Sequence, residues 1–329
     1  MEQLVDKKHL MEIADRVNNW GKWGDKDEIG TLNYVTPECV KEAGNLIKKG
    51  KVFGLGMNFD TNGPQTGKWG RVNPVHTMIY SGTDALLGSC EAVESGVYCA
   101  DDYIMMPVQC ATHWDALGHI FYKNLDTGEL FMWNGYDPRN VDCIRGVTLC
   151  GIEKMRDKMV GRGVLLDIPR FRGVDFLLPG ESITGEEMEA CAKAQGVEIK
   201  SGDFLLVRTG DLGRRLREKD WGTFNSGDAP GVSFESIVWL HDKEVAAIAT
   251  DTWGVEVRPN RTADSLKWVF QPWHWVCIPV CGLTMGEMFM LDELADDCAE
   301  DGRYEFFFTA PPICITNGTG SPLNPQVVK

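Results

Sequence analysis

Four segments of the chain space their apolar residues as an amphipathic helix does. The predicted helices cover residues 8–17, 36–50, 184–196 and 233–243. Serine, threonine or proline at the start of such a segment and glycine after it are typical helix boundaries. Thr36 followed by Pro37 is one of these starts, and the Thr184–Glu187 pair has the spacing of a capping box. The sequence therefore predicts four helices with defined ends.

Short runs of branched apolar residues lie between the predicted helices. They cover residues 164–168, 204–208, 245–249 and 306–315, the last one interrupted by two prolines. Continuous apolar runs of this length are typical of strands that are buried on both faces of a sheet. Alternation of such strands with helices predicts an α/β fold. No linker, repeat or low-complexity tract divides the chain, so we expect one domain over residues 1–329, with an N-terminal helical segment at about 1–50.

Composition and charge narrow the class of partner. The chain has 329 residues, of which 43% are hydrophobic and 25% charged, as in an ordinary soluble protein. Its net charge of -15 disfavours nucleic acid and anionic membranes as partners, because both require a basic surface. No apolar run approaches the roughly 18 residues of a spanning helix, and the N-terminus lacks the apolar core of a signal peptide. We expect a cytoplasmic protein with a small-molecule substrate.

One segment, residues 109–119, concentrates the candidate chemistry. On an extended strand, His113 and Asp115 point to the same face because side chains alternate. Gln109, four residues earlier, is expected on that face too, and His119 follows Gly118, where the chain can turn back. Imidazole and carboxylate groups that converge in this way can hold a divalent metal ion beside a base. The alternative is a pair of core histidines with Asp115 capping a turn.

The same segment carries a resemblance to a known family. Residues 112–119 resemble the signature H-x-G-T-H-x-D-x-P-x-H of the cyclase family of metal-dependent hydrolases, which includes kynurenine formamidase, isatin hydrolase and trans-dienelactone hydrolase. Gln109, Ala111 and Leu117 depart from its first histidine, glycine and proline. Residues 23–33, 251–256, 274–287 and 318–322 resemble further blocks of the longer members.

The resemblance implies a fold, a mechanism and a set of roles. It implies a single curved, barrel-like mixed β-sheet flanked by helices, and a homodimer or larger assembly. His113 and Asp115 correspond to metal ligands, Asp115 as a candidate bridge, and His119 to the acid–base residue. His274 and Glu287 correspond to a second metal site. In the family, a metal-activated water attacks an amide, formamide or lactone carbonyl.

Three points stay open at this level. Glutamine is a weaker ligand than imidazole, so Gln109 leaves manganese or zinc, and one ion or two, as alternatives. His76, Trp114 and Tyr136 are candidates for contact with substrate, against ordinary surface or core positions. A hydrolase is the leading interpretation. The alternatives are a metal-dependent lyase or true cyclase, and a binding protein with a degenerate metal site.

Overall fold

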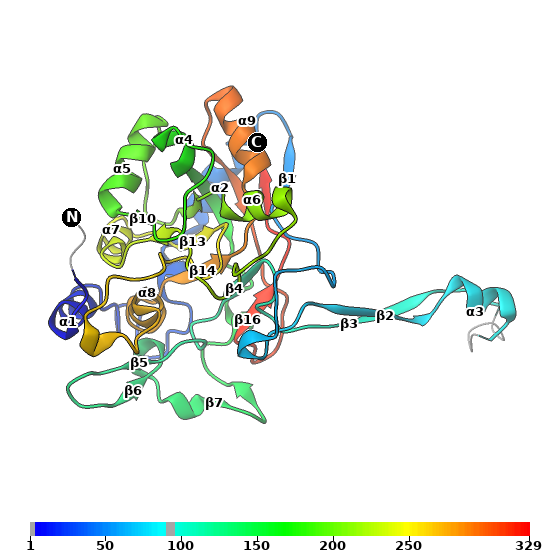
Figure 1. The fold of residues 1–329 in the computed structure, drawn as a ribbon, viewed down its shortest axis with the longest axis horizontal. Coiled ribbons are helices and arrows are strands. Elements are labelled where there is room, and N and C mark those ends of the chain that lie inside the picture. The colour runs from blue at the N-terminus through cyan, green and yellow to red at the C-terminus, as the bar shows by residue number, and fades with distance from the viewer. Residues whose placement is uncertain (1–3, 90–95) are drawn as a thin grey trace.

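A curled, mixed β-sheet is the centre of the molecule (Figure 1). The computed structural model describes residues 4–89 and 96–329, and in this part of the chain the sheet has nine strands. In order across the sheet they are β1 (Val52–Gly54), β17 (Gln326–Val328), β15 (Glu305–Thr309), β9 (Val160–Asp167), β11 (Phe204–Arg208), β13 (Ala247–Thr250), β14 (Thr284–Glu287), β4 (His113–Asp115) and β16 (Gly320–Pro322). The predicted mixed, curved α/β sheet is confirmed.

The middle of the sheet is parallel and the outer parts are antiparallel. Strands β9, β11, β13 and β14 run parallel, with Leu205 opposite Val164 and Ile248. Strands β9, β11 and β13 correspond to predicted apolar runs, and their residues are almost all buried, as expected where helices cover both faces. Strand β14 was not predicted. Strand β15 ends at Thr309, before the two prolines, because proline cannot donate a ladder hydrogen bond.

Helices flank the sheet, with one exception. They are α1 (Lys7–Arg16), α2 (Pro37–Gly44), α3 (Gly82–Leu87), α4 (Ile168–Arg172), α5 (Gly185–Ala194), α6 (Asp211–Glu218), α7 (Ser236–Asp242), α8 (Pro272–Val276) and α9 (Asp292–Asp301). Helices other than α3 flank the sheet, and α1, α2, α5 and α7 begin within three residues of the predicted starts. Thr36 and Thr184 cap α2 and α5, each accepting a hydrogen bond from a backbone N–H of the first turn. Helix α2 is shorter than predicted, because the N–H of Asn45 bonds three residues back, to Glu42, and the helix ends.

Smaller elements complete the body. Three two-stranded ladders pair β5 (Tyr122–Lys123) with β6 (Leu130–Phe131), β7 (Val141–Asp142) with β8 (Gly146–Val147), and β10 (Ser182–Ile183) with β12 (Gly231–Val232). A π-helical turn, Cys277–Cys281, continues α8. Short 3₁₀ helices lie at Gly30–Tyr34, Lys68–Gly70, Trp133–Gly135, Pro138–Asn140, Ile152–Met155 and Asp264–Leu266. Among the described helices, none combines the length and hydropathy that crossing a membrane requires.

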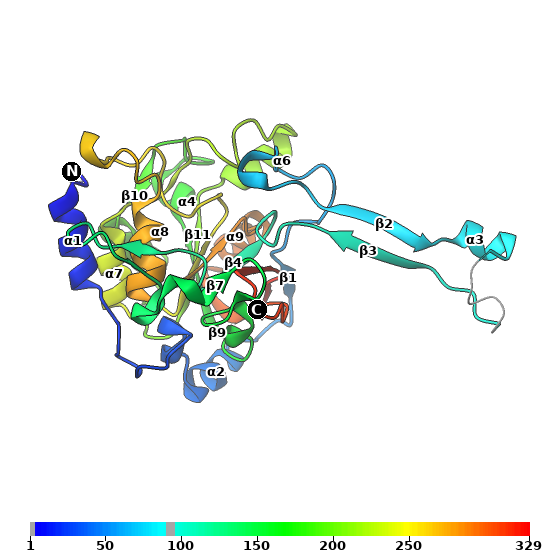
Figure 2. The same ribbon diagram turned by 90° about the horizontal axis from the view of Figure 1, so that it is seen from below.

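A long arm projects from the body (Figures 1 and 2). It consists of β2 (Val75–Tyr80), α3 and β3 (Asp101–Met105). Within the described residues, β2 and β3 pair antiparallel with each other and with no other strand. The sequence analysis predicted no element in this region, because its apolar residues follow neither a buried run nor a helical face.

Candidate metal centre

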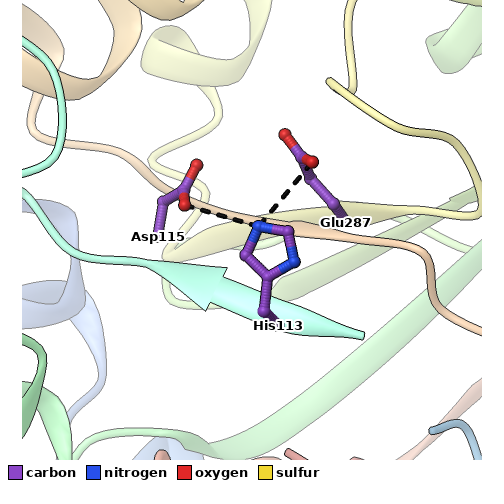
Figure 3. A group of neighbouring side chains, drawn as sticks. All are labelled: His113, Asp115 and Glu287. Atoms are coloured by element: carbon purple, nitrogen blue, oxygen red, sulfur yellow. Dashed lines mark ion pairs between the residues drawn. The ribbon is translucent and has the colours of Figure 1, made fainter. Parts of the chain in front are cut away.

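Strand β4 places the candidate ligands next to a distant part of the chain. It lies between β14 and β16, and His113 is directly opposite Glu287 in the antiparallel pair with β14. Opposite residues of such a pair project to the same face of the sheet. Asp115, two residues along, shares that face, so two ligands from one segment meet a third from another (Figure 3).

The three side chains form a compact and buried group. His113 Nε2 is 3.4 Å from Asp115 Oδ1 and 3.7 Å from Glu287 Oε2. One ligand atom from each residue lies within 4.8 Å of the others. His113 Nδ1 donates to the carbonyl of Ala111 at 2.7 Å, which orients the ring so that Nε2 faces the carboxylates.

Two carboxylate oxygens of the group have no hydrogen-bond partner. Asp115 Oδ1 and Glu287 Oε2 are buried and accept no hydrogen bond in the described structure. Leaving a buried carboxylate oxygen unpaired is costly, unless a cation occupies the space between the ligands. An imidazole nitrogen and two carboxylate oxygens are the donors that divalent metal ions take in hydrolytic sites. The residues therefore fit a divalent cation.

The local electrostatics keep the carboxylates ionised. Burial favours the neutral carboxyl of Asp115, but the imidazoles of His119 and His113 outweigh it and hold its pKa well below the usual value. Burial acts on Glu287 in the same direction, and its hydrogen bond with His274 lowers its pKa overall. Both side chains are thus available as anionic ligands at neutral pH.

His119 lies at the edge of this group. Its backbone N–H closes a turn on Ala116, and a Cβ on Gly118 would lie 2.3 Å from a methyl group of Val147, so only glycine fits there. His119 Nε2 is 3.8 Å from Asp115 Oδ1, and the side chain is partly exposed. Burial lowers the pKa of His119 although Asp115 opposes the shift. The imidazole is neutral at pH 7 and can accept a proton.

His274 joins the group through two glutamates. It lies on α8, where its Nδ1 is 2.6 Å from Glu256 Oε1 and its Nε2 is 3.3 Å from Glu287 Oε1. Burial opposes a charge on His274, but the hydrogen bonds with Glu256 and Glu287 raise its pKa to about 9. The fold thus brings together His274 and Glu287, which are thirteen residues apart in the sequence.

Gln109 is not on the strand. Strand β4 begins only at His113, and Gln109 lies in a turn in which the N–H of Cys110 bonds to Pro107. The expectation of a shared strand face was therefore wrong. Gln109 still reaches this edge of the site, because its Nε2 donates to Thr319 Oγ1 at 3.0 Å and a Cβ on Gly320 would lie 3.0 Å from the same nitrogen.

The three candidate substrate contacts lie away from the ligands. Trp114 is fully buried on the opposite face of β4, where its indole donates to the carbonyl of Ala310. Tyr136 donates its hydroxyl to the carbonyl of Asp25. His76 is exposed on the arm, 2.6 Å from a carboxylate oxygen of Asp102. The structure does not bring these three side chains to the metal centre.

Comparison with known proteins decides the family. The sequence model of the Cyclase family matches residues 19–257. A solved structure described as a novel cyclase is 37% identical, covers 95% of this chain and 100% of its own, and superposes with a TM-score of 0.85. The chain belongs to the Cyclase family.

More distant structures share the cyclase fold. Isatin hydrolase A from Ralstonia solanacearum is 18% identical over 84% of this chain and 91% of its own, with a TM-score of 0.58. A predicted metal-dependent hydrolase from Bacillus stearothermophilus is 17% identical over 84% of this chain and 97% of its own, with a TM-score of 0.50. A search of curated proteins gives no match.

Glu256 is the residue of this cyclase-family site that the sequence analysis did not single out. Its carboxylate accepts from the backbone N–H of Trp273 and of His274 and from the amide of Asn260. It therefore fixes the start of α8 and the orientation of the His274 ring. Residues 251–256 were noticed only as a family block, and the sequence contains no sign that this carboxylate lies against an imidazole eighteen residues away.

Proposed function

We propose that this cyclase-family protein is a metal-dependent hydrolase of a small carbonyl compound. The bond cleaved is a carbonyl C–N or C–O bond, as in an amide, a formamide, a cyclic amide or a lactone. One observation carries the proposal: His113, Asp115 and Glu287 point buried ligand atoms at one another, and two of the oxygens have no hydrogen-bond partner in the described structure. The likeness in fold to an isatin hydrolase and to a metal-dependent hydrolase supports it.

In this proposal, metal binding and proton transfer belong to different residues. His113, Asp115 and Glu287 would hold the ion, with His113 oriented by the carbonyl of Ala111. When bound, a divalent ion supplies Lewis acidity that lowers the pKa of water and polarises a carbonyl oxygen. His119, neutral at pH 7 and partly open to solvent, takes the proton of the attacking water and returns it to the leaving group. The Asp115 carboxylate stabilises the imidazolium that forms during this transfer.

The ligand atoms of the site are compatible with two candidate metals. One imidazole and two carboxylates suit both zinc and manganese, and the amide of Gln109 is a further neutral donor at the same edge. We propose Mn²⁺ or Zn²⁺, with one ion between His113, Asp115 and Glu287. A second ion would require His274 to give up its hydrogen bond with Glu287. Metal analysis of protein purified without added salts measures identity and number.

A panel assay tests the reaction. The substrates are N-formylkynurenine, isatin, aryl amides and unsaturated lactones, given to metal-loaded protein, to chelated protein and to the His119→Ala variant. We expect turnover of at least one class, lost in both controls. Heavy-oxygen water separates hydrolysis from a lyase or cyclisation reaction, because only hydrolysis incorporates the label. Full turnover in metal-free protein would contradict the mechanism.

A further inference from the structure

The buried guanidinium of Arg258 forms no ion pair with the described residues. Its side chain is 1% exposed. Its Nε and Nη2 donate to the carbonyls of Gly227 and Trp253, whereas its Nη1 is buried and has no partner among the described residues. A guanidinium that is buried and bonded only to carbonyls costs several kcal/mol of desolvation. The carboxylates of Glu256 and Glu287 act on this guanidinium through space, but no carboxylate of the described residues lies within ion-pair distance of it, so its Nη1 is open to an anion from outside the chain.

Two further N–H donors lie beside Arg258. Its guanidinium stacks on the ring of Trp253 at 3.9 Å, and the buried indole Nε1 of Trp253 has no partner either. Gly254 has a φ of +88°, and a Cβ there would lie 2.1 Å from Arg258 Nη1 and 2.9 Å from Gln271 Nε2. The guanidinium and the amide thus lie over the same glycine. A side chain at position 254 would displace both groups, so glycine lets these donors lie side by side.

These donors are neighbours of the metal centre. They lie in the loop after β13, and β13 is the parallel neighbour of β14, which ends at Glu287. The N–H of Met288 donates to the carbonyl of Thr252 at 3.1 Å. Trp253 packs in one apolar cluster with Met288 and Ala111, the residues beside Glu287 and close to His113. Ligands bind at the carboxyl ends of parallel strands in open α/β sheets, and both groups lie there.

Aromatic side chains separate the donors from solvent. Phe270 packs against Trp253 and over the guanidinium of Arg258, and Trp69 packs on the outer side of Phe270. Both Phe270 and Trp69 are exposed, so the aromatic layer beside the guanidinium borders on solvent. A chain with a net charge of -15 repels a free carboxylate, and a buried cation in an aromatic wall compensates for that locally.

We propose that Arg258, Trp253 and Gln271 form a subsite for the carboxylate of the substrate, which is therefore an organic acid that also carries the scissile carbonyl group. The proposal rests on the proposed function, since it names the substrate class of that reaction. The charge-assisted bond to Arg258 supplies most of the selectivity, and the indole N–H of Trp253 orients the second oxygen.

Calorimetric titration of the metal-loaded protein tests the subsite with benzoate and its neutral analogue benzamide. We expect benzoate to bind at least about tenfold more tightly, since hydrogen bonds to charged groups are the strong ones. Arg258→Gln should abolish this preference. Trp253→Phe, which keeps an aromatic ring but lacks the indole N–H, should weaken the binding of benzoate by a few-fold. Arg71→Gln is the matched control, because Arg71 is another cation near Cys110 and His119. It should retain the preference.

The outcomes separate the subsite from the reaction. Benzoate selectivity that survives Arg258→Gln at unchanged metal content would place the carboxylate on the ion and overturn the proposal, as would its loss in Arg71→Gln. If Arg258→Gln does not fold, Trp253→Phe decides. Selective benzoate binding in a protein that hydrolyses no member of the panel overturns only the proposed reaction. Hydrolysis with equal kcat/KM for an acid and its carboxamide overturns only the subsite.

Discussion

Two histidine–carboxylate pairs of this protein have the same chemistry and opposite surroundings. His76 and Asp102 pair at 2.6 Å across the ladder of the arm, with side chains 51% and 57% exposed. His113 and Asp115 lie 3.4 Å apart on β4, with side chains 1% and 2% exposed. The exposed pair is the closer one, yet water screens it and satisfies both groups. In the buried pair the Asp115 oxygen that faces His113 has no hydrogen-bond partner in the described structure.

The difference shows what distinguishes a site from an ion pair. Proximity of histidine to carboxylate is common on surfaces and contributes little to stability. Burial makes each carboxylate oxygen without a hydrogen bond costly. Asp115 contributes one such oxygen and the third residue, Glu287, contributes another. The cost is offset when a cation binds, so burial together with missing partners, rather than distance, identifies the metal centre.

The largest contrast should appear when one histidine of each pair is removed. His113→Ala should lower kcat/KM by at least about a hundredfold and reduce the bound metal, because it deletes a direct ligand. His76→Ala should leave both quantities unchanged within a factor of about two, because the side chain is exposed on the arm. Mass-spectrometric metal analysis and steady-state kinetics measure the two. Equal losses would mean that the arm contributes to the site.

Removal of the proton carrier should separate catalysis from metal binding. His119→Ala should lower kcat by about 10²- to 10⁴-fold, the usual contribution of general acid–base catalysis. The metal content should stay at the wild-type level, since His113, Asp115 and Glu287 are intact. Loss of metal together with activity would make His119 a ligand instead of a base.

The pH profile should sharpen the assignment of His119. Because burial lowers its pKa, the neutral, proton-accepting form is present at neutral pH and is lost only as the pH falls below the ordinary range of histidine. We therefore expect kcat/KM to be flat around pH 7 and to fall on the acidic side. The residual activity of His119→Ala should lack that limb. If the wild type and His119→Ala lost activity equally toward acidic pH, the loss would belong to a group other than His119.

The smallest expected effect is that of His76→Ala on the stability of the fold. His76→Ala should change the free energy of unfolding by no more than about 0.5 kcal/mol, as expected for an exposed ion pair. Trp114→Ala, which empties the fully buried side of β4, should cost about 3–5 kcal/mol. Chemical denaturation of the metal-loaded proteins measures both. A large loss from His76→Ala would show that the arm pair supports the fold.

Much of the fold was predictable because its signals are local. Helix starts such as Thr36 and Thr184 and the apolar runs of β9 and β11 depend only on neighbouring residues. The burial of the two apolar runs follows from their composition alone. The arm escaped prediction because its residues have partners only across the ladder, and the end of α2 depended on one hydrogen bond of Asn45.

The sequence by itself determined an α/β sheet, the pairing of His113 with Asp115 on one face, and the family resemblance that pointed to Glu287 and His274. Only the tertiary structure decided that Glu287 lies opposite His113, that Gln109 is in a turn and that Trp114 faces the core. The physical reason is that strand alternation is set within a few residues. Register between β4 and β14 instead depends on packing between segments about 170 residues apart.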